Sequence, residues 1–271
     1  MAKTPIVAVA GNPNSGKTTL FNGLTGSKQR IGNWPGVTVE KKEGSLSIEG
    51  KNITLVDLPG VYSLSAHSED ERIARDFILN GETDLVLNIV DATNLERNLY
   101  LTTQLLDMKV PVLLAVNMQD LADKKGITID LKLLKKKLGC PVIGISAVNQ
   151  GDINKVKAVL ADALQNGVVS DIQATYPQEV EEAIIQWTPL LEGLAQDLGA
   201  NPRWVALKLM EQDQWITDKV SSLEILSVHA INEKISSLES VLGDSSSLFK
   251  VYCRMLQKYT VDAKSKGGTC G

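Results

Sequence analysis

Residues 11–18 have the residue types and spacing of a phosphate-binding loop, G-x-x-x-x-G-K-[ST], directly after the apolar run 6–10. The loop consists of Gly11, Asn12, Pro13, Asn14, Ser15, Gly16, Lys17 and Thr18, and Thr19 follows it. Its backbone N–H groups and the N-terminus of a following helix can surround phosphates. The Lys17 ammonium adds positive charge, and the Thr18 hydroxyl can bind Mg²⁺. The loop therefore predicts a nucleoside triphosphate site.

Residues 117–120 carry groups that distinguish guanine from adenine, in the pattern N-x-x-D. The Asp120 carboxylate can accept hydrogen bonds from N1–H and N2–H₂ of guanine, and adenine offers neither donor. The Asn117 amide would brace the loop. Met118 stands where a lysine is usual, and its side chain would cover the base instead.

A second base-contact loop follows the apolar run 141–145. Ser146, Ala147 and Val148 match the segment whose backbone N–H meets the guanine O6. Leaving the charged carboxylate of the first loop unpaired against adenine would cost about 1–3 kcal/mol or more. The two loops together favour GTP or GDP over ATP.

A third motif, D-x-x-G, comprises residues 57–60 at the end of the apolar run 53–56. Asp57 would hold Mg²⁺ through a water molecule, and the Gly60 N–H would bond the γ-phosphate. Thr38 supplies a second hydroxyl for the metal. The expected Mg²⁺ site therefore consists of Thr18, Thr38 and Asp57, and its loops would be ordered by a triphosphate.

The position that holds a water-orienting glutamine in Ras-like proteins is Val61 in this chain. Valine can neither orient nor polarise water, so we expect slow intrinsic hydrolysis. In some GTPases an asparagine at the position of Asn14 binds K⁺, together with carbonyls that correspond to Gly32 and Trp34. Asn14 could instead only brace the loop, and Trp34 could cap the nucleotide, dock against a neighbour or anchor its own loop. The expected catalytic residues are Asn14, Lys17, Thr38 and Gly60.

These motifs need a sheet whose strands end at a common edge. Up to about residue 166, short β-rich runs alternate with amphipathic helical patterns, which predicts an α/β fold of the Ras-like type. We expect a mostly parallel six-stranded sheet from residues 5–10, 37–48, 51–57, 84–91, 111–117 and 141–145. The expected helices on its two faces are 17–25, 69–80, 95–109, 130–138 and 152–166. The turn at Glu49 and Gly50 indicates one hairpin, and hence an antiparallel edge.

The remaining chain predicts a small all-helical domain, because apolar residues recur there at spacings of three and four. We expect a nucleotide-binding domain over 1–166, a helical domain over 167–262 with a core of its own, and a disordered tail or truncation scar over 263–271. Pro177 and Pro202 suit first turns of helices, and Pro189 should kink or break one. Further helices are expected over 224–242 and 245–262.

Charge and cysteine content restrict the classes of partner. The net charge of this 271-residue chain is −4, which does not favour nucleic acid as a partner. Its apolar runs are too short to span a bilayer, so we expect a soluble cytoplasmic chain. The three cysteines form no metal-ligand pattern, and Cys140 suits a buried core position. The lysines of residues 132–137 are typical of a solvated helix face.

Longer signatures at residues 29–42, 57–64 and 91–102 resemble ferrous iron transport protein B. The resemblance implies a bacterial G protein fused to a membrane-spanning Fe²⁺ transporter, with a helical domain that stabilises bound GDP. It also implies Mg²⁺ and K⁺ as cofactors, and a site at the cytoplasmic face of the inner membrane. The implied partners are GTP, GDP, the membrane-spanning portion, small accessory iron-transport proteins and further copies of the chain.

Two other functions remain open from the residues alone. Ribosome-assembly and tRNA-modification GTPases also combine an asparagine in the phosphate loop with an apolar residue after D-x-x-G. Those proteins usually carry a basic RNA-binding module, whereas the helical half here is acidic. A nucleotide sensor without useful turnover would share every binding motif and would differ only in hydrolysis.

Overall fold

The computed structural model describes residues 3–48, 50–65, 68–167, 169–172, 176–242 and 261–263. Its main sheet has seven strands in the order β2-β3-β4-β1-β5-β6-β8. The strands are β1 Ile6–Gly11, β2 Gln29–Asn33, β3 Glu40–Ile48, β4 Lys51–Asp57, β5 Leu85–Asp91, β6 Val112–Asn117 and β8 Val142–Gly144. From β4 through β8 the neighbouring strands are parallel, so the functional loops leave the sheet at one edge.

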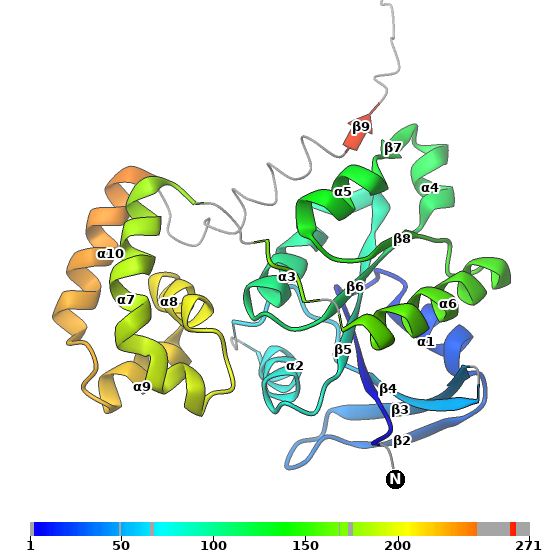
Figure 1. The fold of residues 1–271 in the computed structure, drawn as a ribbon, viewed down its shortest axis with the longest axis horizontal. Coiled ribbons are helices and arrows are strands. Elements are labelled where there is room, and N and C mark those ends of the chain that lie inside the picture. Colours follow the sequence, from blue (N-terminus) through cyan, green and yellow to red (C-terminus); the bar gives the residue numbers. More distant parts are fainter. Residues whose placement is uncertain are drawn as a thin grey trace, which may run out of the picture.

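Helices cover both faces of this sheet because the side chains of the central strands alternate between two buried clusters (Figure 1). In β1, Val7 and Val9 face a cluster with helices α1 Lys17–Thr25 and α6 Gln150–Asn166. Ala8 and Ala10 face the opposite cluster. That cluster contains residues of α2 Glu69–Leu79, α3 Leu95–Asp107 and α5 Leu131–Leu138.

The expected α/β architecture is confirmed, but the count of six strands was wrong. The additional strand is β2, which pairs antiparallel with β3 at the sheet edge. Its sequence, Q-R-I-G-N, is polar and mostly exposed, so no apolar alternation marked it. Strand β3 also begins only at Glu40, which leaves residues 34–39 as a connecting segment. The predicted hairpin between β3 and β4 is present.

The predicted helices of the first part are confirmed to within a few residues. Ser68 caps α2, because its hydroxyl accepts a hydrogen bond from the Glu71 N–H. The sequence reading missed the short 3₁₀ helix η1 Ala92–Asn94 and helix α4 Gln119–Lys124. Cys140 is buried, as expected, and burial raises the pKa of its thiol to about 12.

The second part contains α7 Gln178–Asp197, α8 Pro202–Met210, α9 Gln214–Ser222 and α10 Val228–Leu242. Pro202 begins α8 as expected, whereas Pro177 precedes the first residue of α7. Pro189 does not break α7, which continues through it. The expected helix 224–242 starts four residues later, and α9 was missed.

A small second sheet corrects the expectation that residues after 167 form only helices. Strand β7, Ile127–Ile129, pairs antiparallel with β9, Val261–Ala263. The predicted helix 245–262 therefore does not include its last two residues, and residues 245–260 lie outside the described part. Of the predicted tail 263–271, the structure describes only Ala263, which is in β9.

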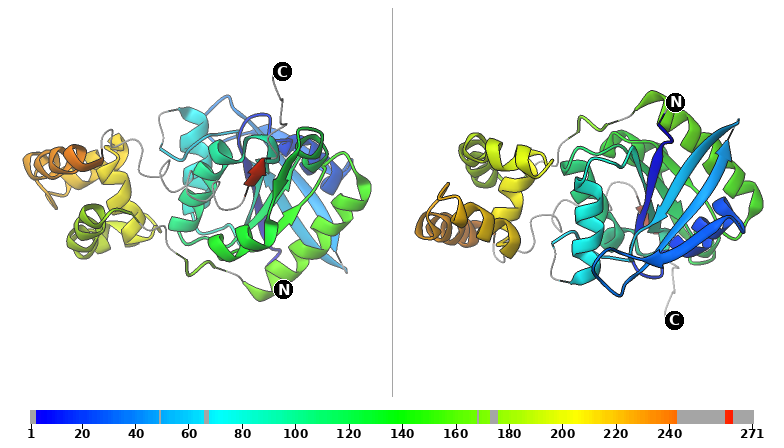
Figure 2. Two further views of the ribbon diagram at one scale, coloured as in Figure 1. Left: turned by 90° about the horizontal axis from the view of Figure 1, so that it is seen from above. Right: turned by 90° about the horizontal axis from the view of Figure 1, so that it is seen from below.

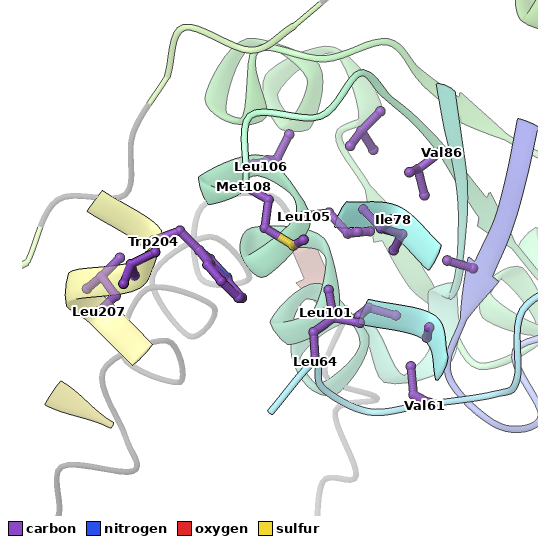
Figure 3. Packing of buried hydrophobic residues seen from close by; sticks show 14 of the residues in the cluster. Val61, Leu64, Ile78, Val86, Leu101, Leu105, Leu106, Met108, Trp204 and Leu207 are labelled. Atoms are coloured by element: carbon purple, nitrogen blue, oxygen red, sulfur yellow. The ribbon is translucent and has the colours of Figure 1, made fainter. Parts of the chain in front are cut away.

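Figure 2 shows α7–α10 as a group beside α2 and α3. The expected separate core for the helical part was wrong, because one buried cluster runs from the sheet through α2 and α3 into α7, α8 and α10. In Figure 3, Trp204 of α8 points toward α3, at whose end Met108 lies. These two side chains and that of Leu207 in α8 are buried. The sheet, rather than the boundary between the two parts, divides the hydrophobic interior.

Candidate nucleotide-binding site

The phosphate loop connects β1 to the first turn of α1, as the motif predicts. Gly16 precedes α1 with φ of 86°, a left-handed conformation that glycine adopts readily. No side chain caps this end of α1, and its first turn has no acidic residue. The free N–H groups and the helix dipole therefore present a positive end to an anion.

Two polar atoms inside the loop are buried without a hydrogen-bond partner among the described residues. They are the Ser15 hydroxyl oxygen and the Asn12 amide oxygen. The Asn12 amide nitrogen is 3.5 Å from the Arg97 carbonyl oxygen, so the loop also contacts the start of α3. Buried polar groups normally have partners, and such orphaned atoms fit a polar ligand that completes the loop.

Asn117 connects three loops at the sheet edge. Its side-chain nitrogen donates to the Ser15 carbonyl at 2.9 Å, and its side-chain oxygen accepts from the Ala147 N–H at 2.8 Å. A Cβ atom on Gly16 would come within 2.1 Å of the same nitrogen. The bracing role expected for Asn117 therefore has a direct geometric basis, and it requires glycine at position 16.

The base-contact residues lie together around Asp120. The Ser146 hydroxyl donates to Asp120 Oδ1 at 2.7 Å and accepts from the Asp120 N–H at 3.2 Å. Met118 adopts a left-handed conformation with φ of 64°, and its methyl carbon lies 3.8 Å from the Cβ position of Gly16. Val148 is 83% exposed beside them. The arrangement leaves Asp120 Oδ2 available to a ligand.

Asp152 also shapes this loop, although the motifs did not indicate it. Its Oδ2 accepts from the Ser146 N–H at 3.0 Å, and the Lys155 ammonium lies 2.7 Å from its Oδ1. These contacts hold the pKa of the carboxyl below its usual value, chiefly through the Lys155 hydrogen bond. The only sequence signal is an acidic residue in the first turn of α6, after the capping residue Asn149.

The D-x-x-G segment lies beside the phosphate loop. The Val61 N–H donates to the Gly11 carbonyl at 3.2 Å, and a Cβ on Gly60 would be 3.4 Å from Pro13. Asp57 is buried and forms an ion pair with the Lys17 ammonium. A carboxylate that pairs with Lys17, together with the hydroxyl of the next residue, the exposed Thr18, is a donor set that suits Mg²⁺.

The remaining metal ligands predicted from the sequence lie in the β2–β3 hairpin. Thr38 is exposed in the 34–39 segment, and Gly32 is in β2 opposite Lys41. The Trp34 carbonyl accepts a hydrogen bond from the Val37 N–H at 3.3 Å. The segment is folded as a turn of the hairpin, and no described contact joins these three residues to the phosphate loop.

The Trp34 side chain holds the β2–β3 hairpin against α2. Trp34 is buried and packs edge-to-face on Phe77 of α2, with ring centroids 5.3 Å apart. The Lys41 ammonium lies 4.9 Å from the Trp34 ring centre. Of the roles considered for Trp34, this structure supports the loop anchor.

Asn14 and Val61 differ in exposure. Asn14 is exposed at the tip of the phosphate loop, with φ of 65°, and its side chain has no hydrogen bond to a described residue. It therefore does not brace the loop here.

Val61 is only 3% exposed and points into the core with Leu64 (Figure 3). Tyr62, next to it, is exposed and stacks on the Arg97 guanidinium at 4.0 Å.

Comparison with known families bears on one of the functions left open by the motifs, the RNA-processing GTPase. Residues 5–160 match the family model described as Ferrous iron transport protein B. Residues 176–255 match the model of the FeoB cytosolic helical domain. The chain belongs to the ferrous iron transport protein B family. The resemblance expected from residues 29–42, 57–64 and 91–102 is thereby confirmed, and neither match favours an RNA-processing GTPase.

Individual members of the FeoB family agree with this assignment. The Fe(2+) transporter FeoB of Salmonella choleraesuis is 44% identical over 212 residues, which are 76% of this chain and 27% of that protein. A GDP-bound point mutant of the S. thermophilus FeoB G-domain has a TM-score of 0.84 at 37% identity, covering 96% of this chain and all of that one. The apo cytosolic domain of T. maritima FeoB has a TM-score of 0.82 at 36% identity, with the same coverage.

The chain spans about a quarter of the length of this curated relative. The helices within its described residues are all too short or too polar to cross a bilayer. Its fold is that of a G domain followed by helices.

The helical part contacts the G domain near the D-x-x-G segment. The Lys208 ammonium of α8 is fully buried, 3.1 Å from the Ser65 hydroxyl and 2.9 Å from Glu211 Oε2. The Arg75 guanidinium of α2 stacks 3.7 Å from the ring centre of Trp215 in α9. The chain segment that begins after Gly60 is therefore held at Ser65 and again in α2.

A buried acid lies in the same contact region. Asp107, the last residue of α3, is 3% exposed, and the Tyr176 hydroxyl is 3.4 Å from its Oδ2. Burial raises the pKa of Asp107 to about 7, although the charges of Arg203 and Lys109 oppose the shift. Arg203 itself donates to both oxygens of another acid, Glu181, at 2.8 Å.

Proposed function

We propose that this chain binds GTP and GDP, hydrolyses GTP, and acts as the nucleotide-dependent switch of a bacterial Fe²⁺ transporter. The bridge made by Asn117 carries the proposal. One side chain holds the phosphate loop and the second base-contact loop at fixed positions, and Asp120 lies three residues further on. The GDP-bound relative from S. thermophilus supports the same assignment.

Guanine selectivity follows from the contacts of Asp120. Ser146 already donates to Oδ1, so Oδ2 and the second lone pair of Oδ1 accept from guanine N1–H and N2–H₂. The left-handed backbone at Met118 brings its side chain toward Gly16, where it covers one face of the base. Adenine would offer the carboxylate no donor from the base, at a cost of about 1–3 kcal/mol or more.

The phosphates bind where Lys17 and Asp57 now form an ion pair. The positive end of α1 and the loop N–H groups attract the phosphates, and Lys17 exchanges its Asp57 contact for phosphate oxygens. Thr18, Asp57 through water, and Thr38 would hold Mg²⁺, which neutralises phosphate charge when bound. Thr38 joins them only if residues 34–39 leave the hairpin, so binding of GTP and release of Trp34 are coupled.

The residue after Gly60 cannot assist hydrolysis, because Val61 has no polar group and its side chain is buried in the core. The Gly60 N–H, beside Pro13, bonds the γ-phosphate and helps to orient it. Asn14 offers an exposed amide oxygen near the same position. It fits K⁺ as a ligand, whereas the Gly32 and Trp34 carbonyls would reach the ion only after the hairpin refolds.

Nucleotide binding is tested by titrating fluorescent GDP, GTP and ATP into the purified chain. We expect GDP and GTP to bind and ATP to bind at least about tenfold more weakly, from the unpaired carboxylate. Asp120→Asn should weaken guanine nucleotides, and xanthine nucleotides should bind it better because they carry an acceptor where guanine has its amino group. Equal affinities for ATP and GTP would overturn the assignment.

Hydrolysis is tested in K⁺ and in Na⁺, with the unmodified chain and with Asn14→Ala. We expect slow turnover that K⁺ accelerates, and loss of that acceleration in the variant with GDP affinity unchanged. Equal rates in the two salts would refute the role of K⁺. Absence of hydrolysis in either salt would instead favour a nucleotide sensor without turnover.

The role in transport concerns a longer protein that contains this chain. In that protein the chain would lie at the cytoplasmic face of the inner membrane. The same Asp120→Asn variant, placed in the full-length transporter, should reduce nucleotide-dependent Fe²⁺ uptake into cells. If the variant no longer binds GTP but Fe²⁺ uptake is unchanged, the switch does not control transport. Small accessory proteins and further copies of the chain are additional partners that we infer from the family alone.

A further inference from the structure

Helices α4 and α5 carry a cluster of lysines that the nucleotide site does not use. We call it the lysine face, and it consists of Lys124, Lys125, Lys132, Lys135 and Lys136. All five side chains are exposed, and none forms an ion pair with a described residue. Figure 1 shows α4 and α5 near one another, with β7 between them in the chain.

The cluster stands out from the charge of the rest of the chain. Residues 119–138 contain six lysines and three aspartates, in a chain whose net charge is −4. Two of those aspartates have other contacts, since Asp120 bonds Ser146 and Asp130 caps α5 by accepting from the Leu133 N–H. Positive charge is therefore concentrated on the exposed surface of α4 and α5, in an otherwise acidic protein.

Helix stability accounts for only part of this pattern. Lysines in the last turn, such as Lys135 and Lys136, interact favourably with the helix dipole. Lys132 lies in the first turn of α5, where a positive charge is unfavourable. Its position there points to a role for the face beyond helix capping.

The chain returns to this face after the helical part. Strand β9 pairs antiparallel with β7, and Ala263 lies opposite Ile127, two residues after Lys125. Figure 2 also shows β9 on the G-domain side, away from α7–α10. The sequence after Ala263 adds Lys264 and Lys266. The curated relative, a transporter, is almost four times as long as the stretch that this chain covers.

We propose that the lysine face docks on anionic lipid headgroups of the membrane that holds the rest of the transporter. Exposed Leu121 and half-buried Leu133 lie among the lysines and give the face an apolar component. The inference rests on the proposed function in one respect, namely that a membrane-spanning portion belongs to the same protein.

Lipid fits this face better than nucleic acid does. Residues 119–138 contain no aromatic residue and no arginine. Single-stranded nucleic acid is usually held by aromatic stacking, and base edges by bidentate arginine. Lysine is a hydrated point charge, which suits the diffuse negative potential of a lipid surface.

The test measures co-sedimentation of the chain with vesicles at low salt. One set contains phosphatidylglycerol and phosphatidylcholine in equal parts, and the other only phosphatidylcholine. The variant is Lys132→Gln/Lys135→Gln/Lys136→Gln. The control is Lys28→Gln/Lys51→Gln/Lys219→Gln, which removes three exposed lysines from other parts of the chain and gives the same net charge.

We expect binding to the phosphatidylglycerol vesicles only, with loss at high salt. Each lysine near an anionic surface contributes about fivefold in binding, so the variant should bind about a hundredfold more weakly. The control should lose no more than about threefold. Thermal unfolding, measured on both variants, checks that each is folded.

Three results would overturn the proposal. They are no binding to the phosphatidylglycerol vesicles, equal losses in variant and control, and tighter binding to total RNA than to the vesicles at the same salt concentration. None of them depends on GTP hydrolysis or iron uptake, so the proposed function could stand when docking fails. Vesicle binding could likewise be present in a chain that does not bind GTP.

Discussion

Replacing Asp107 by asparagine should remove a pH dependence of stability that the contact between the two parts creates. Asp107 is buried at the end of α3, near Tyr176 and Arg203, and its pKa is raised from 3.8 to about 7. Asparagine has nearly the same shape and no ionisable group. Its side-chain oxygen can still accept the hydrogen bond from the Tyr176 hydroxyl.

The sign follows from proton binding in the two states. Below about pH 4 the carboxyl is protonated whether the chain is folded or unfolded, so it contributes no pH dependence. Between about pH 4 and pH 7 the folded chain keeps the proton and the unfolded chain loses it, so stability falls as the pH rises. The difference of about three pH units corresponds to about 4 kcal/mol. Above about pH 7 the loss is complete and constant.

The assay is thermal unfolding of the unmodified chain and of Asp107→Asn across this pH range. The difference between the two proteins at each pH isolates the contribution of Asp107 to stability. We expect nearly equal melting temperatures at about pH 4, and a variant that is more stable by a few kcal/mol at about pH 8. For a chain of this size, each kcal/mol of stability shifts the melting temperature by about 2–4 °C. Parallel pH profiles of the two proteins would refute the argument that Asp107 is buried as a neutral acid.

Three further experiments test other contacts. Gly16→Ala places a Cβ 2.1 Å from an amide nitrogen of the N-x-x-D motif, so GDP should bind at least about tenfold more weakly by fluorescence titration. Gly193→Ala in α7 is the control, because it meets no neighbouring atom and needs no left-handed backbone, and it should bind GDP normally. A double-mutant cycle on Arg75 and Trp215 should give a coupling of about 1 kcal/mol in chemical denaturation, and a coupling near zero would refute the stacking contact. Trp34→Ala should accelerate amide exchange in β2 and the start of β3 more than elsewhere, and uniform acceleration would contradict its role as the hairpin anchor.

Much of the candidate site could be predicted because its motifs are local and follow strands. Parallel strands end at one sheet edge, so Gly16, Asp57 and Asn117 had to lie near one another once the strands were correctly placed. Patterns of residue type also identified the capping residue Ser68 and the first residue of α8, Pro202. These features depend on a few neighbouring residues and on backbone geometry.

The missed features depend on contacts between residues far apart in the chain. Strand β2 has no apolar alternation and exists because β3 offers it a partner. Pro189 is tolerated within α7, because buried residues of the helix precede and follow it, such as Trp187 and Leu191. The 3-residue strand β7 pairs with β9, more than a hundred residues later. No local pattern distinguishes such segments from loops.

By itself, the sequence determined the phosphate loop and the mostly parallel sheet, and it predicted a guanine-selective edge, since these follow from residue types at strand ends. The tertiary structure decided where the side chains around that site point. It buries Val61 in the core, packs Trp34 on Phe77, and continues one hydrophobic cluster from the sheet into the helical part. Apolar side chains pack wherever buried surface is available, and that surface exists only when distant segments have come together.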